Sequence, residues 1–290
     1  MKVLWSSSPA VHHNLAWEEW WVDHFAERGP ALLFYVNTPS LVVGKNQNPW
    51  REAATDWLRE RGMPIGRRIS GGGTVYHDEG NLNFTLIVPR ASYRKSEIFE
   101  KTLAALRALG LPVALMADNN SIALSGKKIS GTAFCFRGQA AMHHGTILVH
   151  SQLELLRRAL VPAISDVETR AIASNRTSVA NVHESAPHLT VEAVAGSLAQ
   201  HLAGARAWEV AVEPDDDLFR TLAARHREWD WVFGHTPVFT WRLNAHGDIQ
   251  RITVERGVIV RAEPETAQAR RWIGSRFDVA SGGPFFYPGV

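Results

Sequence analysis

The residues best suited to chemistry lie at 67–78, where three consecutive glycines follow a pair of arginines and precede a His-Asp pair. Glycine has no Cβ, so the backbone of Gly71, Gly72 and Gly73 can adopt positive φ and allow a ligand close to its amide groups. Amide groups in succession form a nest for a carboxylate or phosphate, and Arg68 can grip the same oxygens with its planar guanidinium. The segment therefore predicts an anion-binding loop, although three glycines alone would more often mark a flexible surface hairpin.

A second cluster lies at 119–133 and contains a Ser-Gly turn. Two short strands around this turn return Lys128 to the neighbourhood of Asn120. A lysine beside an anion nest is suited to neutralising charge on a transferring carboxylate or phosphoryl group. The small residue Gly131 favours a close backbone approach at Lys128, whereas most lysines, Lys127 among them, are expected to be solvated.

Two adjacent histidines, His143 and His144, occupy a further strand-like run. Successive side chains on a strand point to opposite faces, so the two rings cannot bind one metal ion together. The sequence contains no HExxH pattern and no cysteine cluster, which argues against a structural zinc site and leaves any metal ligands unassigned. One inward histidine, with Gly145 and Thr146 beside it, would line a ligand pocket. A packed, hydrogen-bonded histidine is the alternative.

Cys135, the only cysteine, lies between Phe134 and Phe136. A single cysteine excludes an intramolecular disulfide and fits a reducing cytoplasm. Its thiolate would form a thioester if a neighbour lowered its pKa, but a cysteine between two aromatic residues is more often a small buried hydrophobe. The patterns GxSxG and GxxxxGK[ST] are absent, so ATP, if it is used, is held in another way.

These clusters are expected to be carried by strands. Residues 81–88 alternate and then become apolar, as a half-buried strand does. Asn14 is expected to cap a helix that ends near residues 29–30. Strands often follow each other directly, which predicts an α+β fold with mixed, largely antiparallel sheets flanked by helices. Further strands are expected at 31–36 and 41–44, within 113–149 and within 238–263, and helices at 51–61, 95–109, 190–203, 215–227 and 265–273.

The composition is that of an ordinary globular protein. The 290 residues are 45% hydrophobic and 21% charged, with a net charge of +2 that does not demand nucleic acid. The N-terminus lacks the apolar core of a signal peptide, and no stretch of about eighteen apolar residues occurs, so a cytoplasmic protein without a membrane span is expected. The best linker, at 244–248, would divide a domain of residues 1–243 from a segment of residues 244–290.

Taken together and in this order, the motifs resemble those of the lipoate–protein ligase A family, within the biotin and lipoate protein ligase superfamily. Residues 67–85 are similar to the family's lipoate-binding loop, and residues 128–133 to its catalytic-lysine motif. The resemblance extends over about residues 12–243. The other matching segments are the opening helix at 14–19, the turn at 44–50 and the runs at 143–146, 174–181 and 229–239.

The resemblance implies a biotin/lipoyl-ligase-like catalytic domain that works in two steps. Lipoate and ATP, with Mg²⁺, would give lipoyl-AMP, and a lysine of a carrier protein would then receive the lipoyl group. The implied carriers are the apo lipoyl domains of 2-oxoacid dehydrogenase acyltransferase subunits and the glycine-cleavage H protein, and the implied enzyme is a cytoplasmic monomer of lipoate salvage. Lys128 would be the catalytic residue. Lipoate or its adenylate would be bound by Arg68, Ser70, Gly71, Gly72, Gly73, Val75, His77, Asn81, Asn83, Asn120, His144, Gly145 and Thr146.

The sequence departs from the family pattern in two places. Asn120-Ser121 stands where the family usually has Asn-Asp, so a nucleotide or metal contact would lose its carboxylate. Residues 244–290 are short for the family's C-terminal accessory domain and resemble only its beginning, with 249–263 as its first hairpin. Both departures keep open a lipoyl or octanoyl transferase of the same fold that does not itself use ATP, acting through a Cys135 thioester or a preformed adenylate. A non-catalytic binder of lipoyl proteins is the third possibility.

Overall fold

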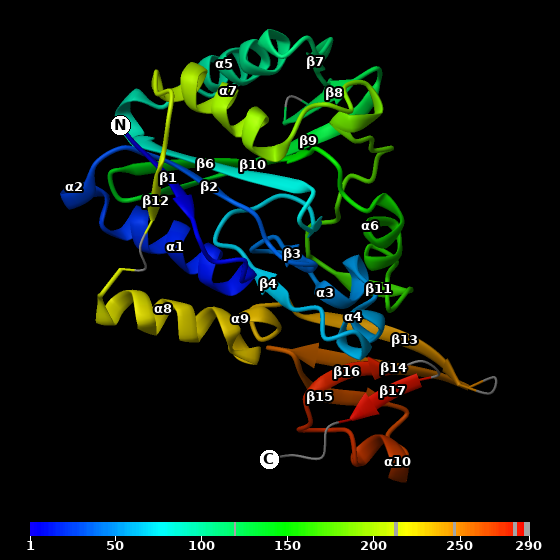
Figure 1. Ribbon diagram of the computed structural model, residues 1–290. Coiled ribbons are helices and arrows are strands. Elements are labelled where there is room, and N and C mark those ends of the chain that lie inside the picture. Colours follow the sequence, from blue (N-terminus) through cyan, green and yellow to red (C-terminus); the bar gives the residue numbers. More distant parts are fainter. Residues whose placement is uncertain (119, 212–213, 246–247, 281–282, 287–290) are drawn as a thin grey trace.

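A computed structural model describes residues 1–118, 120–211, 214–245, 248–280 and 283–286 (Figure 1). Within these ranges the strands form four sheets, in which most neighbouring strands are antiparallel. The structure therefore confirms an α+β fold with mixed, largely antiparallel sheets. The largest of these sheets has the strand order β12 (Glu209–Ala211), β1 (Lys2–Ser6), β2 (Ala31–Tyr35), β6 (Asn81–Pro89), β10 (Ala140–Leu148), β9 (Lys127–Arg137), β8 (Ser121–Leu124) and β7 (Val113–Leu115).

Helices cover both faces of this sheet. In Figure 1, α5 and α7 lie together on one face, and α1 lies on the other with α8 beside it. None of the helices in the described ranges has both the length and the apolar character needed to cross a membrane. The helices are α1 (Val11–Asp23), α2 (Phe25–Arg28), α3 (Pro49–Glu52), α4 (Thr55–Glu60), α5 (Lys95–Ala108), α6 (Leu153–Ala159), α7 (Val191–Ala203), α8 (Asp217–Arg227), α9 (Trp229–Val232) and α10 (Ala267–Arg270), with short 3₁₀ turns at Arg90–Ser92 and Val182–Glu184.

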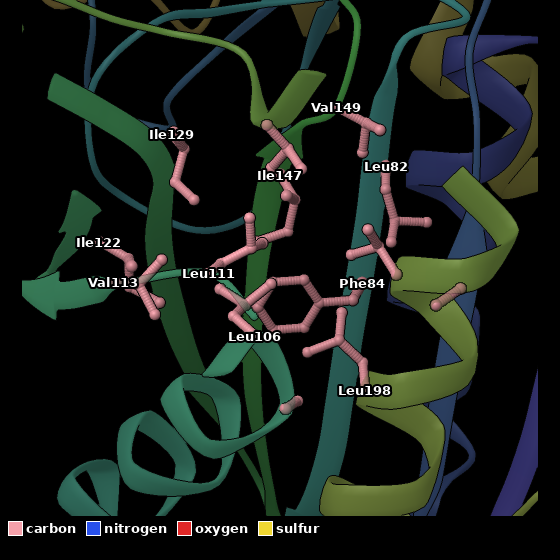
Figure 2. Close-up of a cluster of buried hydrophobic side chains, with 14 of the residues drawn as sticks. Leu82, Phe84, Leu106, Leu111, Val113, Ile122, Ile129, Ile147, Val149 and Leu198 are labelled. Atoms are coloured by element: carbon pink, nitrogen blue, oxygen red, sulfur yellow. The ribbon is translucent and has the colours of Figure 1, made fainter. Parts of the chain in front are cut away.

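Apolar and polar side chains alternate along β6, so the strand directs them to opposite faces of the sheet. Leu82 and Phe84 point toward α5 and α7 and join the buried cluster that Figure 2 shows, together with Leu106 and Leu198 of those helices. Because side chains on a strand alternate between faces, Asn83 and the polar residues in step with it point to the other side. The alternation predicted from the sequence is confirmed, and it delivers a row of buried polar groups to the face opposite the core.

A smaller sheet lies against that polar face. Its strand order is β4 (Ile65–Arg67), β3 (Ser40–Val43) and β5 (Val75–His77). The glycine loop connects β4 to β5, so it lies between the small sheet and the large one. The pairing of β3 with β4 is parallel. Although β2 and β3 are adjacent in the sequence, they belong to different sheets.

The C-terminal strands build a further core. One sheet has the order β11 (Val167–Thr169), β13 (Phe239–Ala245), β14 (Asp248–Glu255) and β15 (Val258–Glu263), and β16 (Phe277–Ala280) pairs with β17 (Gly283–Phe286). Trp50 of α3 packs against Phe239 and Phe277, and so anchors this core to the N-terminal part of the chain. The boundary between residues 243 and 244 lies inside β13, and the division into two domains stays a prediction.

Asn14 does not cap α1, contrary to the expectation from the sequence. The helix begins at Val11, and Asn14 lies within its first turns with a fully buried side chain. Its amide nitrogen donates to the carbonyl of Ser8 and to Asn37, and its oxygen accepts from Ser6. Local preference favours asparagine at a helix start. Here tertiary hydrogen bonds determine its position instead.

Candidate active site

A cavity of about 310 Å³, named cavity 1 here, lies between the large sheet and the sheet of β3 and β5. It crosses the large sheet, because it is lined by residues of β2, β6, β10, β9 and β8. Strand pairing connects Tyr35 with Asn83 and Asn83 with Thr146 across its floor. Three strand spacings separate β2 from β9, a distance of roughly 14 Å. The cavity is thus a channel along which a chain-like ligand can extend.

Cavity 1 collects most of the site residues predicted from the sequence. Three of the predicted binding residues, Ser70, Gly71 and Asn81, are outside its lining. Ser70 and Asn81 are buried behind it. The predicted residues that line it are Arg68, Gly72, Gly73, Val75, His77, Asn83, Asn120, Lys128, His144, Gly145 and Thr146.

Lys128 reaches the end of cavity 1 near β8. The lysine folds over Gly131, where a Cβ would lie only 3.0 Å from both Nζ and Cε, so the glycine leaves room for the ammonium group. The backbone of Lys128 bonds to Ser178 and Ala180, which holds the residue from the side of β9. Burial lowers the pKa of Lys128 below its ordinary value, with the charge of Asp118 opposing the shift. Lys127 is exposed and lies 3.9 Å from Glu184, as predicted for a surface lysine.

Asp118 is a functional candidate that the sequence motifs did not reveal. It lines cavity 1 beside Asn120 and Ser121, and its carboxylate accepts hydrogen bonds from the Ser121 hydroxyl at 2.6 Å and the Ser121 amide at 3.0 Å. Burial would raise its pKa, but the bonds from Ser121 and Asn120 and the charge of Lys128 hold that pKa below the ordinary value. A carboxylate is therefore present near Lys128 although residue 121 is serine. The serine orients it from three positions away.

Arg68 holds the glycine loop closed. Its guanidinium donates to the carbonyls of Gly71 and Gly73 at 2.6 and 2.7 Å, to Val42, and to the hydroxyl of Ser70. No carboxylate bonds to it directly among the described residues, and burial lowers the pKa of Arg68 to about 10, where the group is still a cation at neutral pH. A buried positive charge therefore lies along the cavity, with loop carbonyls as its partners.

Gly72 is the loop residue for which a side chain is least compatible with this arrangement. Its φ is +86°, and a Cβ would lie 3.0 Å from Nη2 of Arg68. We expect Gly72→Ala to cost about 1–2 kcal/mol of backbone strain, and to lower kcat/KM about tenfold to a hundredfold because the loop and Arg68 shift together. Steady-state kinetics and thermal unfolding measure the two effects. Gly71→Ala is the control, since a Cβ there has no neighbour within 4 Å, and an equal loss in both variants would contradict the argument.

A chain of buried hydrogen bonds leads from Arg68 through Ser70 and His144 to Glu18. Nε2 of His144 lies 2.6 Å from the hydroxyl of Ser70, and Nδ1 lies 3.0 Å from the carboxylate of Glu18. The hydroxyls of Tyr35 and Thr85 also donate to Glu18. Burial would raise the pKa of Glu18, but His144 and these donors hold it below its ordinary value. The chain thus links Glu18 through His144 to Ser70, which accepts a hydrogen bond from Arg68. The charge of Glu18 stabilises the buried guanidinium of Arg68 without a direct hydrogen bond between them.

The two adjacent histidines separate as predicted. His144 faces cavity 1, whereas His143 faces α5, where its Nδ1 lies 3.0 Å from the Tyr93 hydroxyl and its ring meets Phe99 edge-on. Burial lowers the pKa of His143 to about 3. His143 is the packed, hydrogen-bonded histidine, and His144 is the one in the pocket.

Arg67, although adjacent to Arg68, has a structural role. Its guanidinium donates to the carbonyls of Gly44, Gln47 and Val232 and to the hydroxyl of Thr236. These bonds tie the turn after β3 to the segment that follows α9. The pair of arginines in the sequence is therefore divided between one cation in the site and one that holds segments together.

A second cavity of about 310 Å³, cavity 2, adjoins the first at Lys128. The two share a set of wall residues, and cavity 2 continues between β5 and α6. Its walls combine leucines with the charged residues Glu52, Arg157 and Arg176. Two buried hydroxyls in the lining, of Tyr76 and Ser130, have no partner among the described residues. The shared residues are Thr74, Val75, Lys128, Gly131, Thr146, Ser174 and Asn175.

Cys135 lies apart from both cavities. It packs against the hydrophobic cluster around α1 and is outside the described lining of cavities 1 and 2. Burial raises the pKa of its thiol, and the nearby charges of Arg137 and Lys45 only partly oppose this. The described His, Cys, Asp and Glu residues contain no group of three positioned to hold a metal ion. The candidate reactive centre is therefore the junction of the two cavities, where Lys128 lines both.

Comparisons with known proteins show the family of the chain. The human lipoyl amidotransferase LIPT1, a mitochondrial protein, is 34% identical over 254 residues, covering 84% of this chain and 68% of the relative. The Bacillus subtilis lipoate-protein ligase LplJ is 34% identical over 237 residues, covering 78% and 71%. A crystal structure of P. falciparum LipL1 in complex with lipoate shares the fold, with a TM-score of 0.72 at 24% identity over 90% of this chain and 83% of that one. The family model of the lipoyl protein ligase A/B catalytic domain matches residues 10–203, and the chain belongs to this family of lipoate ligases and lipoyl transferases.

Proposed function

We propose that the protein is an ATP-dependent lipoate–protein ligase, which forms lipoyl-AMP from lipoate and ATP and transfers the lipoyl group to a lysine of a carrier protein. The observation that carries the proposal is the meeting of two cavities of about 310 Å³ at Lys128. An adenylate-forming enzyme must bring a carboxylate and a nucleotide phosphate to one point. Cavity 1 offers a channel for the acyl chain, and cavity 2 offers space for the nucleoside.

Each polar group at the junction has a place in this reaction. The ammonium of Lys128 would neutralise charge on the α-phosphate in the first step and on the carbonyl oxygen in the second. The glycine loop, held by Arg68, would offer its amides to the same oxygens. Asn120, which receives a hydrogen bond from Lys95 at 2.7 Å, would bind the nucleotide beside Lys128. In this proposal these residues bind and orient the substrates. No residue of the chain forms a covalent bond to the acyl group or to the nucleotide.

Mg²⁺ fits the same junction. In nucleotide sites this ion is commonly held by one or two carboxylates together with phosphate oxygens. Asp118, fixed by Ser121 in cavity 1, would supply the protein carboxylate, and the nucleotide would supply the rest. The ion would neutralise phosphate charge there.

Lipoate-dependent exchange of pyrophosphate into ATP tests the proposal. We expect exchange with lipoate and ATP in the absence of any carrier, and lipoylation when an apo carrier is added. If a carrier is lipoylated from preformed lipoyl-AMP but no exchange occurs, the ligase proposal fails in favour of transfer.

That second function has its own support. A relative with 34% identity is named an amidotransferase, and this chain has Ser121 in place of the family's aspartate. In this alternative the same cavities would take a lipoyl group from a donor protein or from a preformed adenylate. Incubation with a lipoylated donor domain and an apo acceptor, without ATP, distinguishes the two functions by intact-protein mass.

The thioester route is expected to fail. We predict that Cys135→Ala retains lipoylation activity within about twofold, since the thiol lies away from both cavities and its pKa is raised rather than lowered. Initial rates of carrier lipoylation measure this. Loss of activity with unchanged thermal unfolding, together with an acyl-thioester mass on the wild-type chain, would restore the cysteine as a nucleophile.

The proposed carriers are apo lipoyl domains of 2-oxoacid dehydrogenase acyltransferase subunits and the glycine-cleavage H protein. The names of the two relatives support a lipoyl acceptor in general. It stays a prediction which of these carriers the protein modifies. The cytoplasmic location, the monomeric state and the role in lipoate salvage are predictions as well. Mass spectrometry of several apo carriers, each incubated separately with the enzyme, would rank them by rate.

A further inference from the structure

The end of cavity 1 opposite Lys128 contains a histidine whose outer nitrogen has no partner. His77 lines the cavity from β5, and Nε2 is buried without a hydrogen bond to any described residue. The nearby walls are supplied by Leu15, Tyr35 and Val42, on the side of β2 and β3. A chain-like ligand with its carboxylate at Lys128 would place its far end here.

The hydrogen of this imidazole can be assigned from a chain of hydrogen bonds. The carbonyl oxygen of Ser8 only accepts, so the Asn14 atom 2.8 Å from it is the amide nitrogen. The same nitrogen lies 2.8 Å from Asn37, which must present its oxygen. The other end of Asn37 is therefore its amide nitrogen, and it donates to Nδ1 of His77 at 2.9 Å. Ser6 completes the chain by donating to the oxygen of Asn14 at 2.7 Å.

Nδ1 of His77 is thus an acceptor, and a neutral ring must carry its hydrogen on Nε2. The ring is neutral because burial, with the charge of Arg68, lowers the pKa of His77 to about 3. Ser6, Asn14, Asn37 and His77 are all buried, so water does not loosen the arrangement. The chain therefore fixes an N–H donor at the end of the cavity and prevents this ring from acting as an acceptor.

We propose that the Ser6–Asn14–Asn37 chain fixes His77 as an N–H donor that selects acyl groups with a hydrogen-bond acceptor at the far end, such as the sulfur ring of lipoate, over plain fatty acids such as octanoate. The inference rests on the proposed function and specifies the substrate of that same site. A thioether-type sulfur is a weak acceptor. A hydrocarbon end would leave the buried donor unpaired, and a site built for a hydrogen bond discriminates against a ligand that lacks it. His77 contacts the substrate, and Asn37 is a positioning residue.

Binding of the free acids without nucleotide tests the proposal. We expect calorimetry to show wild-type protein binding lipoate about five- to tenfold more tightly than octanoate, the low end of the range for an unpaired buried donor because sulfur accepts weakly. His77→Phe keeps a ring of similar shape without the N–H and should bring this ratio close to one. Asn37→Ala should lower the same ratio with His77 still present. Val42→Ala is the matched control, since it removes only apolar contact and should weaken both acids alike.

A measurement on the unmodified protein keeps the proposal testable if a variant does not fold. Nitrogen NMR of histidine-labelled wild type should show Nδ1 of His77 unprotonated and Nε2 protonated, and lipoate should shift the Nε2–H resonance more than octanoate does. Binding of neither acid would overturn the proposed function itself. Binding of both acids with an equal ratio in wild type and His77→Phe, or a proton on Nδ1, would overturn the donor role and leave the ligase proposal intact.

Discussion

Replacing Lys128 by alanine is expected to lower the rate of lipoyl transfer by about a hundredfold to a thousandfold, the loss typical of removing one preorganised group that stabilises charge in the transition state. Lys128 is the charged residue shared by the two cavities, and Gly131 gives its ammonium group room at their junction. Both half-reactions should be slowed, since negative charge develops on phosphorus in the first and on the carbonyl oxygen in the second. Pyrophosphate exchange and transfer from synthetic lipoyl-AMP measure these steps separately.

The fold should be unaffected by this change. Burial disfavours the charged form of Lys128 and lowers its pKa, so we expect removal of the ammonium group to cost little stability. Lys127→Ala is the matched control, because the neighbouring lysine is exposed and only 3.9 Å from Glu184, and it should retain activity within about twofold. Full activity of Lys128→Ala would favour a non-catalytic binder.

Glu19→Gln is expected to lower the free energy of unfolding by about 3 kcal/mol at pH 7, as is typical when one partner of a buried ion pair is removed. Glu19 is buried on α1 and receives hydrogen bonds from Arg137 at 2.9 Å, from His226 at 2.8 Å and from Arg225. Although burial alone would raise the pKa of Glu19, the bonds and charges of His226 and Arg225 lower it to about 2. The interaction joins α1 to α8 and to the end of β9. Urea unfolding of both proteins at pH 7 measures the loss.

The pH dependence gives a second test of the same group. A carboxylate with a lowered pKa in the folded state contributes its full stabilisation above its unfolded pKa of about 4.3, and this contribution is lost as the pH falls toward 2. The difference in stability between wild type and Glu19→Gln should therefore shrink between about pH 5 and pH 2. Asp217→Asn, at a fully exposed pair with Arg220, is the control and should leave stability unchanged. A constant difference across this range would exclude the charge as the cause.

The position of the site was predictable because its residues are grouped in short motifs. The glycine loop, the segment around Lys128 and the strand of His144 each bring several polar residues together within a few positions. Strand alternation then assigns His143 and His144 to opposite faces without any knowledge of their partners. The structure places these segments around one cavity, as their shared chemistry indicated.

Other features could not be predicted, since their partners are distant in the sequence. Asp118 has no motif of its own, and its role depends on the turn that lets Ser121 donate to it. The sequence leaves a nucleophilic Cys135 open as an alternative, because nothing in it shows that the thiol lies away from the cavities. Local preference predicts Asn14 as a helix cap, whereas a buried hydrogen bond to Asn37 determines where it lies.

The sequence by itself determined the α+β fold and the family, and it singled out Lys128 as the candidate catalytic lysine, because these depend on residue type and on short spacings. Only the tertiary structure decided what each polar group bonds to. Arg68 turned out to bind the carbonyls of its own loop, and the hydrogen of His77 is placed by a chain that begins at Ser6. Hydrogen bonds between separate strands and helices are fixed by packing, and packing brings together residues whose separation along the chain contains no such information.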